Sequence, residues 1–410
     1  MNSVTEMKKR ILFVDDEPTM LELFQLMFKP LETDWDLGYA TSGLEGLAMM
    51  DKQPFEVVIT DMNMPGMNGA QFLNEVMEKH PRTARFILSG YAEQDTVAKC
   101  VGAAHQYLMK PCDMNTIRTT LSRVCALDVF LENGHLKDLV ARMNVLPSIP
   151  SVYFQVMKEL QSPYASMERI GELVSMDPAM TAKLLQMVNS AFFGICREIS
   201  NPLDAIELLG VNTIRSLALS IHAFSCFDQK VSDKLSFEHV WSHCMAVGTF
   251  AKKIAQNQDT DTTLVDEAFI GGLLHDIGKL MLLANMPAQY EVAIDQARQK
   301  GIPLVEAEKE IFGATHASVG AYLLGLWGLP VPIVEAVALH HSPMENVQES
   351  FTPLTAVHIA DVIEHEHSKT RDGLLPPEFH QSYLSDLGLL DSIPDWRSEF
   401  ATMTSEGEAA

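Results

Sequence analysis

The chain has 410 residues, of which 47% are hydrophobic and 20% are charged. This is an ordinary globular composition, and the length predicts two or three domains rather than one. Acidic residues outnumber basic ones by 54 to 30, giving a formal net charge of -24. That balance argues against direct DNA binding, because neutralising phosphates requires clustered Lys and Arg.

The cysteines and the N-terminus point to the interior of the cell. The six cysteines form no CxxC pair, so neither a zinc ribbon nor a redox motif is indicated, and reduced thiols in a cytosol are expected. The apolar run at residues 11–14 is too short for a signal peptide, and no apolar stretch approaches the length of a membrane span. We therefore expect a cytoplasmic protein without a membrane partner.

Residues 9–125 alternate short apolar runs with amphipathic stretches such as residues 20–28 and 43–50. Four runs are typical of buried strands: ILFV at 11–14, FEVVIT at 55–60, RFILSG at 85–90 and QYLMK at 106–110. This alternation predicts a parallel sheet with helices on both faces.

From about residue 126 the alternation stops, and helical periodicity dominates up to residue 365. The prolines of LPSIP at 146–150 mark a boundary, and further Pro and Gly residues break the pattern into many helices. Asp177-Pro178 predicts a helix start, with an N-cap carboxylate before a proline. The small, acidic residues 403–410 predict a frayed tail.

Chemically active side chains follow the predicted strands of the first region. Asp15 and Asp16 come after the first apolar run, and Asp61 comes after the second. Ser89 and Lys110 come at the ends of the last two. Functional groups gather at the carboxyl ends of parallel strands, where three carboxylates repel one another unless a cation such as Mg²⁺ lies between them. Asp61 is then placed to attack a phosphoryl group, while Lys110 and Ser89 stabilise the charge and the oxygens of that group.

These features, in this order, resemble the receiver domain of two-component response regulators over residues 9–125. The resemblance implies a doubly wound, five-stranded parallel α/β sheet like that of CheY, with Mg²⁺ as cofactor and a histidine kinase as partner. It makes Asp61 the phosphoacceptor and a metal ligand, together with Asp15 and Asp16. It gives Asn63 the role of a main-chain metal ligand.

The same resemblance assigns the remaining residues of the receiver site. Ser89 corresponds to the switch hydroxyl, Tyr107 to the aromatic switch and Lys110 to the active-site lysine. No position departs from the family pattern, so a working receiver is expected.

In the helical region, residues 271–280 read GGLLHDIGKL and place His275 beside Asp276 in an apolar run. Apolar residues between 270 and 281 follow helical spacing and predict one buried stripe. Lys279 is four residues from His275 and three from Asp276, so all three are expected on one helix face. Burying such groups is costly unless they are paired, so a metal site and a purely structural role both stay open.

Other histidines and acids recur at helical distances along this region. Mixed imidazole and carboxylate ligands from separate helices suit Fe, Mn or Zn in a bundle core. The candidates are His243, His316, His340, His341 and Asp361. A lone helical histidine is more often structural, and we interpret four further histidines in that way: His239, His358, His365 and His367.

The ordered series H…HD…H…HH…D resembles the HD superfamily of metal-dependent phosphohydrolases. Residues 146–365 resemble one branch more closely, the HD-related output domain (HDOD), which implies an all-helical, HD-like domain. The motifs that carry this resemblance are LPSIP at 146–150, Asp177-Pro178, Asn189-Ser190, Leu209-Gly210, LLHDIGKL at 273–280 and WGLP at 327–330.

The HD resemblance also implies a ligand set. The metal-binding H, HD and D positions correspond to His243, His275, Asp276 and Asp361. The extra histidines of two-metal members correspond to His316, His340 and His341. Lys279 is a candidate phosphate contact. The cyclic-di-GMP phosphodiesterases of the superfamily have a Gly-Tyr-Pro motif after the HH pair, and this chain has none.

The sequence therefore leaves two alternative functions. In the first, a response regulator switches an HDOD signalling domain that binds an unknown protein, or changes a homodimer, when Asp61 is phosphorylated. In the alternative, phosphorylation regulates a metal-dependent hydrolase of a nucleotide or cyclic dinucleotide. The expected division of the chain is a receiver at 1–125, a helical linker at 126–145, an HDOD domain at 146–365 and an extension with a disordered tail at 366–410.

Overall fold

The computed structural model describes residues 8–31, 35–89, 104–110, 166–175, 202–209, 237–258, 261–346, 350–368 and 373–408, with scattered residues between 117 and 159. The chain divides into two units near Ser151. Three quoted motifs, LPSIP, Asp177-Pro178 and Asn189-Ser190, lie outside the described residues, as does most of the expected linker at 126–145.

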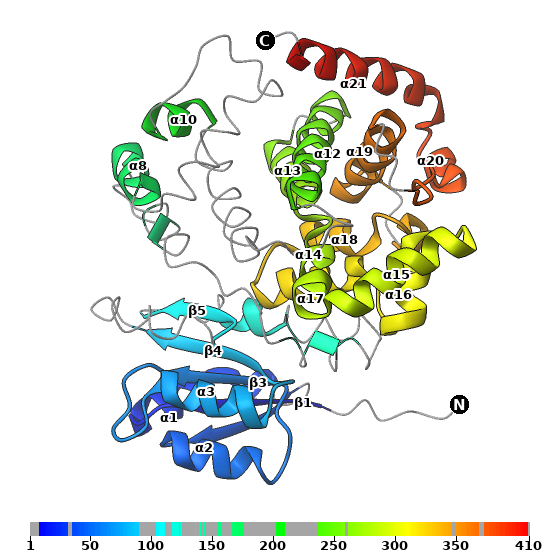
Figure 1. The fold of residues 1–410 in the computed structure, drawn as a ribbon. Helices are drawn as coiled ribbons and strands as arrows, with labels where there is room; N and C mark the ends of the chain where they lie inside the picture. The colour runs from blue at the N-terminus through cyan, green and yellow to red at the C-terminus, as the bar shows by residue number, and fades with distance from the viewer. Residues whose placement is uncertain are drawn as a thin grey trace. The chain divides into compact units, whose positions relative to one another are not determined.

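The N-terminal unit is built on a parallel sheet (Figure 1). Its strands are β1 (Lys9–Val14), β2 (Trp35–Ala40), β3 (Val57–Asp61), β4 (Ala84–Ser89) and β5 (Gln106–Met109), in the order β2-β1-β3-β4-β5. The helices described with it are α1 (Pro18–Phe28), α2 (Gly43–Met50) and α3 (Gly69–Lys79).

Helices cover both faces of this sheet, as the alternating pattern predicts. Phe13 of β1 stacks on Phe24 of α1, with ring centroids 4.9 Å apart. The next residue, Val14, points to the opposite face, where its Cγ2 lies 3.2 Å from where a Cβ on Gly46 of α2 would be. Strand β2 was not among the four apolar runs, because at this edge of the sheet only Trp35 and Ala40 are buried.

The described elements of the C-terminal unit are all helices, as predicted. Its helices are α8 (Met167–Ser175), α10 (Pro202–Leu209), α12 (Phe237–Gln258), α13 (Thr262–Leu274), α14 (Ile277–Asn285), α15 (Pro287–Lys300), α16 (Leu304–Phe312), α17 (His316–Leu326), α18 (Val331–Leu339), α19 (Pro353–His367), α20 (Gln381–Asp386) and α21 (Ile393–Glu408). Short 3-10 turns cover Lys29–Leu31 in the first unit, and Pro343–Glu345 and Leu390–Ser392 in the second.

The structure has two helices where the apolar spacing of residues 270–281 predicts one. His275 and Asp276 form a turn between α13 and α14 instead of lying within one continuous helix. The His275 ring explains the break, because its Nδ1 lies 2.7 Å from the Gly272 carbonyl oxygen. That oxygen would accept from the backbone N–H of Asp276 in an uninterrupted helix.

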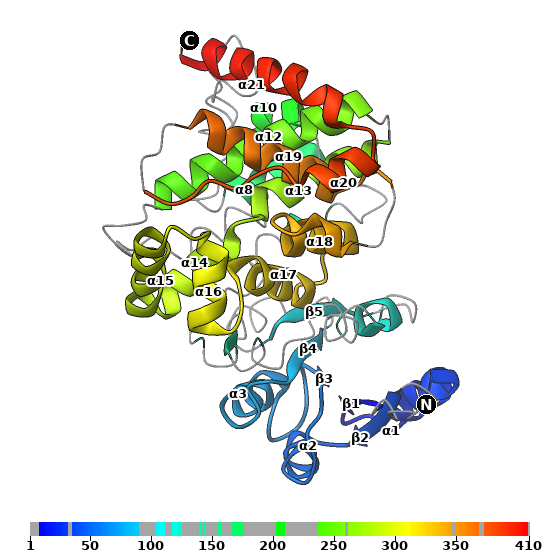
Figure 2. The same ribbon diagram turned by 90° about the vertical axis from the view of Figure 1, so that its right-hand side faces the viewer.

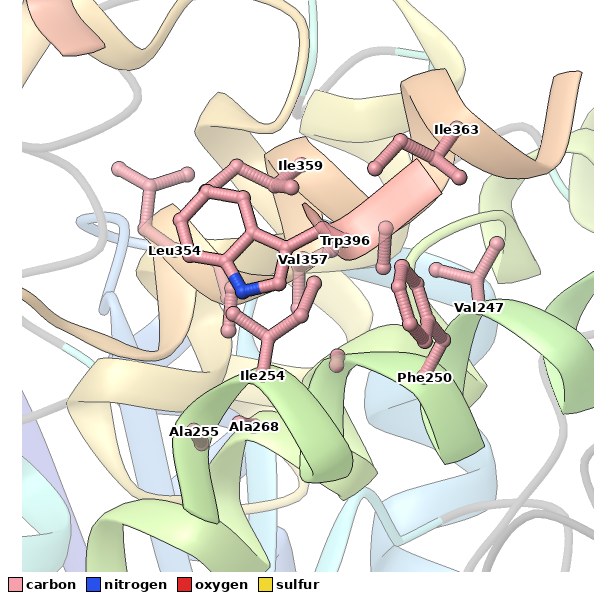
Figure 3. Packing of buried hydrophobic residues seen from close by; sticks show 14 of the residues in the cluster. Val247, Phe250, Ile254, Ala255, Ala268, Leu354, Val357, Ile359, Ile363 and Trp396 are labelled. Carbon is pink, nitrogen blue, oxygen red and sulfur yellow. The ribbon is translucent and has the colours of Figure 1, made fainter. Parts of the chain in front are cut away.

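A large apolar core joins α12, α13, α19 and α21 (Figure 3). Phe250 of α12 meets Phe400 of α21 edge to face, with ring centroids 4.9 Å apart. Trp396, one turn earlier on α21, lies in the same cluster beside Ile254 and Ile359. Burial of this stripe anchors the helix that carries it.

The anchored helix corrects the expectation of a disordered tail. Helix α21 runs to Glu408, so residues 403–408 continue a helix whose earlier turns are docked on the core. The small, acidic composition indicated fraying, but Trp396 and Phe400 fix the helix upstream and Met403 packs against the same cluster. No helix within the described part of the chain has the length and apolar character needed to cross a membrane.

Candidate functional site

The first candidate site lies at the carboxyl edge of the parallel sheet. Asp61 ends β3 and Asp15 follows β1, and Lys110 follows β5. The Lys110 ammonium forms ion pairs with Asp61 Oδ1 and, at 3.3 Å, with Asp15 Oδ2. Backbone N–H groups supply the other partners: Asn63 donates to Asp61 Oδ2 at 2.8 Å and Glu17 donates to Asp15 Oδ1 at 2.9 Å.

This geometry fits a small, oxygen-liganded cation. Asp15 and Asp61 are buried, Asp16 is half-buried, and all three lie at the strand ends. Burial alone would lower the pKa of Lys110, but its hydrogen bonds to Asp61 and the charges of Asp61 and Asp15 raise it. One cation thus already neutralises two carboxylates, and carboxylate oxygens are the ligands that Mg²⁺ prefers.

Two predicted receiver residues are placed by their backbone alone. Ser89 is the last residue of β4 and Tyr107 lies in β5. Their side chains are outside the described part of the structure. Their roles as switch residues therefore stay predictions.

The second candidate site lies among the helices of the C-terminal unit. The structure brings all seven predicted ligand residues into one cluster, in overlapping groups whose ligand atoms lie within 4.8 Å of one another. They come from α12, α17, α19, the turn between α13 and α14, and the end of α18: His243, His275, Asp276, His316, His340, His341 and Asp361.

Backbone contacts at glycines bring these helices close enough to share a site. A Cβ on Gly272 of α13 would lie 2.7 Å from the Cα of Gly248, so α12 and α13 touch backbone to backbone. A Cβ on Gly278 of α14 would lie 1.9 Å from the carbonyl oxygen of His316. These two contacts set His243 beside His275, and His316 beside the turn that carries Asp276.

Asp276 links two halves of the cluster. Its Oδ2 lies 3.5 Å from His275 Nε2 and 3.6 Å from His243 Nε2, while its Oδ1 lies 3.2 Å from His316 Nε2. The "Asp361 half" comprises His243, His275 and Asp361. The "His316 half" comprises His316, His340 and His341.

Several buried polar atoms in the cluster accept no hydrogen bond. Asp276 Oδ1, both Asp361 oxygens and His340 Nε2 have no hydrogen-bond partner among the described residues. The nearby histidine nitrogens lie within ion-pair distance of the carboxylates but lack hydrogen-bond geometry. Leaving such groups unsatisfied costs free energy, so this donor set fits a cation better than it fits an apolar core.

The ring orientations of His275 and His340 also fit a bound cation. His275 Nδ1 lies 2.7 Å from the Gly272 carbonyl and His340 Nδ1 lies 2.8 Å from the Val337 carbonyl. A carbonyl oxygen only accepts, so each Nδ1 carries the hydrogen and each neutral Nε2 presents a lone pair. His275 Nε2 is also 3.0 Å from His243 Nε2, a pairing that needs a proton or a metal ion between the two nitrogens.

Electrostatics divides the histidines of the cluster into two kinds. Burial opposes the charged form of His243, but Asp361 and Glu364 raise its pKa to about 10. Burial likewise opposes the charged form of His316, whose pKa the charge of Glu308 and the nearby Asp276 carboxylate raise to about 9. Burial lowers the pKa of His340 and His341 well below the usual range, with help from neighbouring histidines.

Both aspartates of the cluster are held ionised. Burial would raise the pKa of Asp276, but Lys279 and then His275 and His316 lower it well below the usual range. Lys279 Nζ lies 2.6 Å from Asp276 Oδ2, as the spacing of the two residues predicts. The pKa of Asp361 is lowered in the same way against burial, first by His365 and then by His243 and His275.

Three residues of this centre escaped the sequence analysis. His365 was interpreted as background, yet its Nδ1 lies 3.0 Å from Asp361 Oδ1, and it belongs to a candidate metal-binding group with His243 and Asp361. The spacing in ADVIEH held a usable signal, since Glu364 and His365 follow Asp361 at three and four residues. Glu308 gave no signal, because AEKEIF has the charge pattern of an exposed helix, yet Glu308 is fully buried.

The other background histidines fit their interpretation. His239 is exposed, and His367 packs on Phe400 with ring centroids 5.3 Å apart. His358 is buried, with Nδ1 2.8 Å from the His340 carbonyl oxygen and Nε2 accepting from the backbone N–H of His380.

Comparison with known proteins identifies both regions. The response regulator receiver domain family matches residues 11–122, and the HDOD domain family matches residues 146–343. An uncharacterized protein of Treponema pallidum is 25% identical over 213 residues, which are 52% of this chain and 40% of that protein. The hydrogenase transcriptional regulatory protein HoxA of Cupriavidus necator is 27% identical over 169 residues, which are 41% of this chain and 34% of that protein. The matches thus span less than half of these relatives.

Solved structures share the fold of the helical unit. The crystal structure of an HDOD domain protein of unknown function from Geobacter sulfurreducens matches 67% of this chain and 98% of its own, with a TM-score of 0.53 and 20% identity. A putative phosphohydrolase from Shewanella amazonensis matches 68% of this chain and 97% of its own, with a TM-score of 0.52 and 22% identity. Given the parallel sheet, the helical centre and both family matches, this chain contains a response regulator receiver domain at residues 11–122 and an HDOD domain at residues 146–343.

Proposed function

We propose that the protein is a response regulator in which Asp61 accepts a phosphoryl group from a histidine kinase. The observation that carries this proposal is the Lys110 ammonium bridging Asp61 and Asp15 at the carboxyl edge of the sheet. Asp15, Asp16, Asp61 and the main chain of Asn63 are suited to hold Mg²⁺ there.

Phosphoryl transfer at this site needs few groups. A carboxylate oxygen of Asp61 forms a bond to phosphorus as the bond between phosphorus and the kinase's histidine nitrogen breaks. Lys110 is placed to neutralise the negative charge that collects on the phosphoryl oxygens. Bound Mg²⁺ supplies further charge neutralisation. Ser89 and Tyr107 then respond to the new charge and change the surface of the receiver.

The test is phosphorylation of the full chain by a small acyl phosphate in the presence of Mg²⁺. Intact-mass measurement should show one added phosphoryl group in the parent protein and none in the Asp61→Asn variant. Asp16→Asn should slow the reaction by weakening Mg²⁺ binding without removing the acceptor. Equal labelling of the parent and the Asp61→Asn variant would refute the assignment.

The output of the phosphorylated receiver is the HDOD domain. We propose that it signals by binding another protein or by changing self-association, in the cytoplasm and without contacting DNA. Partner capture and sedimentation of the phosphorylated chain, compared with the Asp61→Asn variant, test this step. Identical behaviour of both proteins would refute it.

A second candidate function is hydrolysis of a phosphate ester or anhydride at the helical centre. Four buried atoms without hydrogen-bond partners, on Asp276, Asp361 and His340, favour it. The seven predicted ligands are suited to hold one or two ions of Fe, Mn or Zn, which activate water when bound. Lys279 is placed to bind a phosphate oxygen. The Shewanella amazonensis neighbour is named a putative phosphohydrolase, and the proposal extends that chemistry to this chain.

Elemental analysis of protein purified without chelators separates the two functions. Tightly held Fe, Mn or Zn in the parent, lost in the Asp276→Ala variant, supports a working centre and justifies assays with nucleotides and cyclic dinucleotides. Mg²⁺ in the receiver binds weakly and washes away. Absence of metal from both proteins would refute the hydrolase and leave the signalling function.

A further inference from the structure

Two histidines of the helical centre are oriented by carboxylates that are not candidate ligands. His243 Nδ1 lies 2.5 Å from Glu364 Oε2, and His316 Nδ1 lies 2.8 Å from Glu308 Oε2. The Nδ1 atoms of His275 and His340, in contrast, face backbone carbonyl oxygens. Each half of the centre therefore contains one histidine backed by a carboxylate.

Glu308 is built into the protein interior. It has no exposed surface, and its two oxygens accept from the Tyr290 hydroxyl at 3.0 Å and from both the backbone N–H and the ring of His316 at 2.8 Å. Three donors thus hold one carboxylate, and that carboxylate holds both the backbone and the ring of His316. Helix α16, which carries Glu308, lies beside α17, which begins with His316 (Figures 1 and 2).

Glu364 supports the other half from the same helix as a candidate ligand. It follows Asp361 by three residues on α19, so both carboxylates face His243. Asp361 Oδ1 lies 3.2 Å from His243 Nε2, while Glu364 lies on the Nδ1 side of the ring. The imidazole is therefore held between two carboxylates that leave it one orientation.

A carboxylate behind an imidazole has two effects on metal binding. It fixes the hydrogen on Nδ1, so that Nε2 presents its lone pair to the ion, and it makes the ring a stronger base. We propose that Glu308 and Glu364 are the positioning residues of the two halves, each preparing one histidine to bind one metal ion, with Tyr290 fixing Glu308. This inference rests on the metal centre of the second candidate function.

The two supports are unequal. Glu308 is fully buried and accepts hydrogen bonds from three donors, whereas Glu364 is 9% exposed at the edge of the cluster. An amide in place of Glu308 would turn its NH₂ group either toward His316, whose N–H groups cannot accept, or toward Tyr290, whose hydroxyl would then have to accept from the amide instead of donating to it. The Glu308→Gln change should therefore weaken its half of the centre more than Glu364→Gln weakens the other.

Titration of the metal-free, full-length protein with Co²⁺ tests the proposal, because bound Co²⁺ is visible in the absorption spectrum without any assay of activity. The parent should bind about two ions. Glu308→Gln should weaken one of them by about 10- to 100-fold and leave the other unchanged, and Glu364→Gln should weaken only the other ion, toward the lower end of that range.

Combining each glutamate variant with the loss of one histidine shows which half of the centre each glutamate supports. Glu308→Gln should have no further effect on Co²⁺ binding when His316 is already alanine, but it should keep its full effect when His243 is alanine. The pattern should reverse for Glu364→Gln. A general structural role would weaken both ions in every background, which would overturn the proposal.

Tyr290→Phe keeps the test valid if the buried amide disturbs folding. It removes one hydroxyl from Glu308 and should weaken the same Co²⁺ ion by about tenfold. Two ions bound with parental affinity by all three single variants would overturn the positioning roles and leave the centre intact. A parent that binds no Co²⁺ beyond the receiver would overturn the centre itself, and these roles with it.

Discussion

The receiver and the helical unit each contain an aspartate paired with a lysine among other acidic groups, but they satisfy these groups differently. In the receiver, all four oxygens of Asp15 and Asp61 have donors from Lys110 or from backbone N–H groups. In the helical centre, both Asp361 oxygens have no hydrogen-bond donor among the described residues, although Lys279 pairs with Asp276.

This difference separates a site that is ready for a transient ligand from a site that is incomplete without a resident one. The receiver carboxylates are stable as they stand, so a weakly bound ion and a passing phosphoryl group are enough for their chemistry. The helical centre concentrates uncompensated groups away from water, where a bound cation would stabilise the fold itself. The predictions below test that contrast.

The largest expected effect is the loss of stability when Lys279, the partner of the buried Asp276, is replaced. The Lys279 side chain is 14% exposed and that of Lys110 is 31% exposed. Removing one partner of a buried ion pair costs about 3–5 kcal/mol, because the other charge stays buried. In metal-free protein, Lys279→Met should therefore lower the free energy of unfolding of the helical unit by about that amount. Lys110→Met should cost the receiver less, about 1 kcal/mol, because Lys110 is more exposed and backbone N–H groups still donate to Asp15 and Asp61.

Hydrogen exchange with peptide-level detection measures the two regions separately in one sample. Lys253→Met is the matched control, since Lys253 forms an exposed ion pair with Glu399 at 3.6 Å and should contribute less than about 1 kcal/mol. Equal losses for Lys279→Met and Lys253→Met would show that the helical centre is not electrostatically strained, and the contrast between the two regions would fail.

Metal removal should produce the next largest effect, confined to one region. An ion present at one hundred times its dissociation constant stabilises the folded state by about 2.7 kcal/mol. A strong chelator should therefore lower the melting temperature of the helical unit and leave the receiver unchanged in Mg²⁺-free buffer. In the Asp361→Asn variant the chelator should have little effect. A chelator-induced shift confined to the receiver would reverse the proposed difference.

The sequence predicted the receiver site more completely than the helical one, for a physical reason. Parallel strands place their carboxyl ends at one edge, so Asp15, Asp61 and Lys110 are brought together by topology alone. A helical centre depends on which faces meet, and periodicity gives the apolar face of a helix but not its neighbour. Glu308 could not be found in this way, because its partners Tyr290 and His316 lie on other helices.

The break at His275 shows the same limit at shorter range. The apolar spacing across residues 270–281 is helical, and α13 and α14 each keep it. The spacing does not reveal that a side chain competes with the backbone for a carbonyl oxygen. Here His275 Nδ1 takes the Gly272 oxygen that the backbone N–H of Asp276 would bind in a continuous helix. The expected tail failed for a related reason, because its order comes from Trp396 and Phe400 upstream.

Helix contact at glycine should matter in the helical centre. A Cβ on Gly278 would meet the His316 carbonyl oxygen, a backbone atom, whereas one on Gly271 would meet Ala336 Cβ at 3.1 Å and Val357 Cγ2 at 3.3 Å. Overpacking costs about 1–3 kcal/mol, so Gly278→Ala should destabilise the helical unit by that amount and weaken metal binding. Gly271→Ala should be nearly neutral, because a better helix former offsets its mild crowding by about 1 kcal/mol. Denaturant unfolding and Zn²⁺ titration of both variants measure this, and equal behaviour would contradict the backbone contact.

The smallest expected effect concerns His365, which decides how far the centre extends. His365 Nδ1 lies 3.0 Å from Asp361 Oδ1, and the charge of His365 is the largest influence lowering the pKa of Asp361. A group that orients a ligand without binding the ion itself is worth about tenfold in affinity, or about 1.4 kcal/mol. We therefore expect His365→Ala to weaken Zn²⁺ binding about tenfold, while His239→Ala, at an exposed position on α12, changes nothing. Complete loss of one ion would make His365 a ligand of the Asp361 half, and unchanged affinity would return it to the structural background.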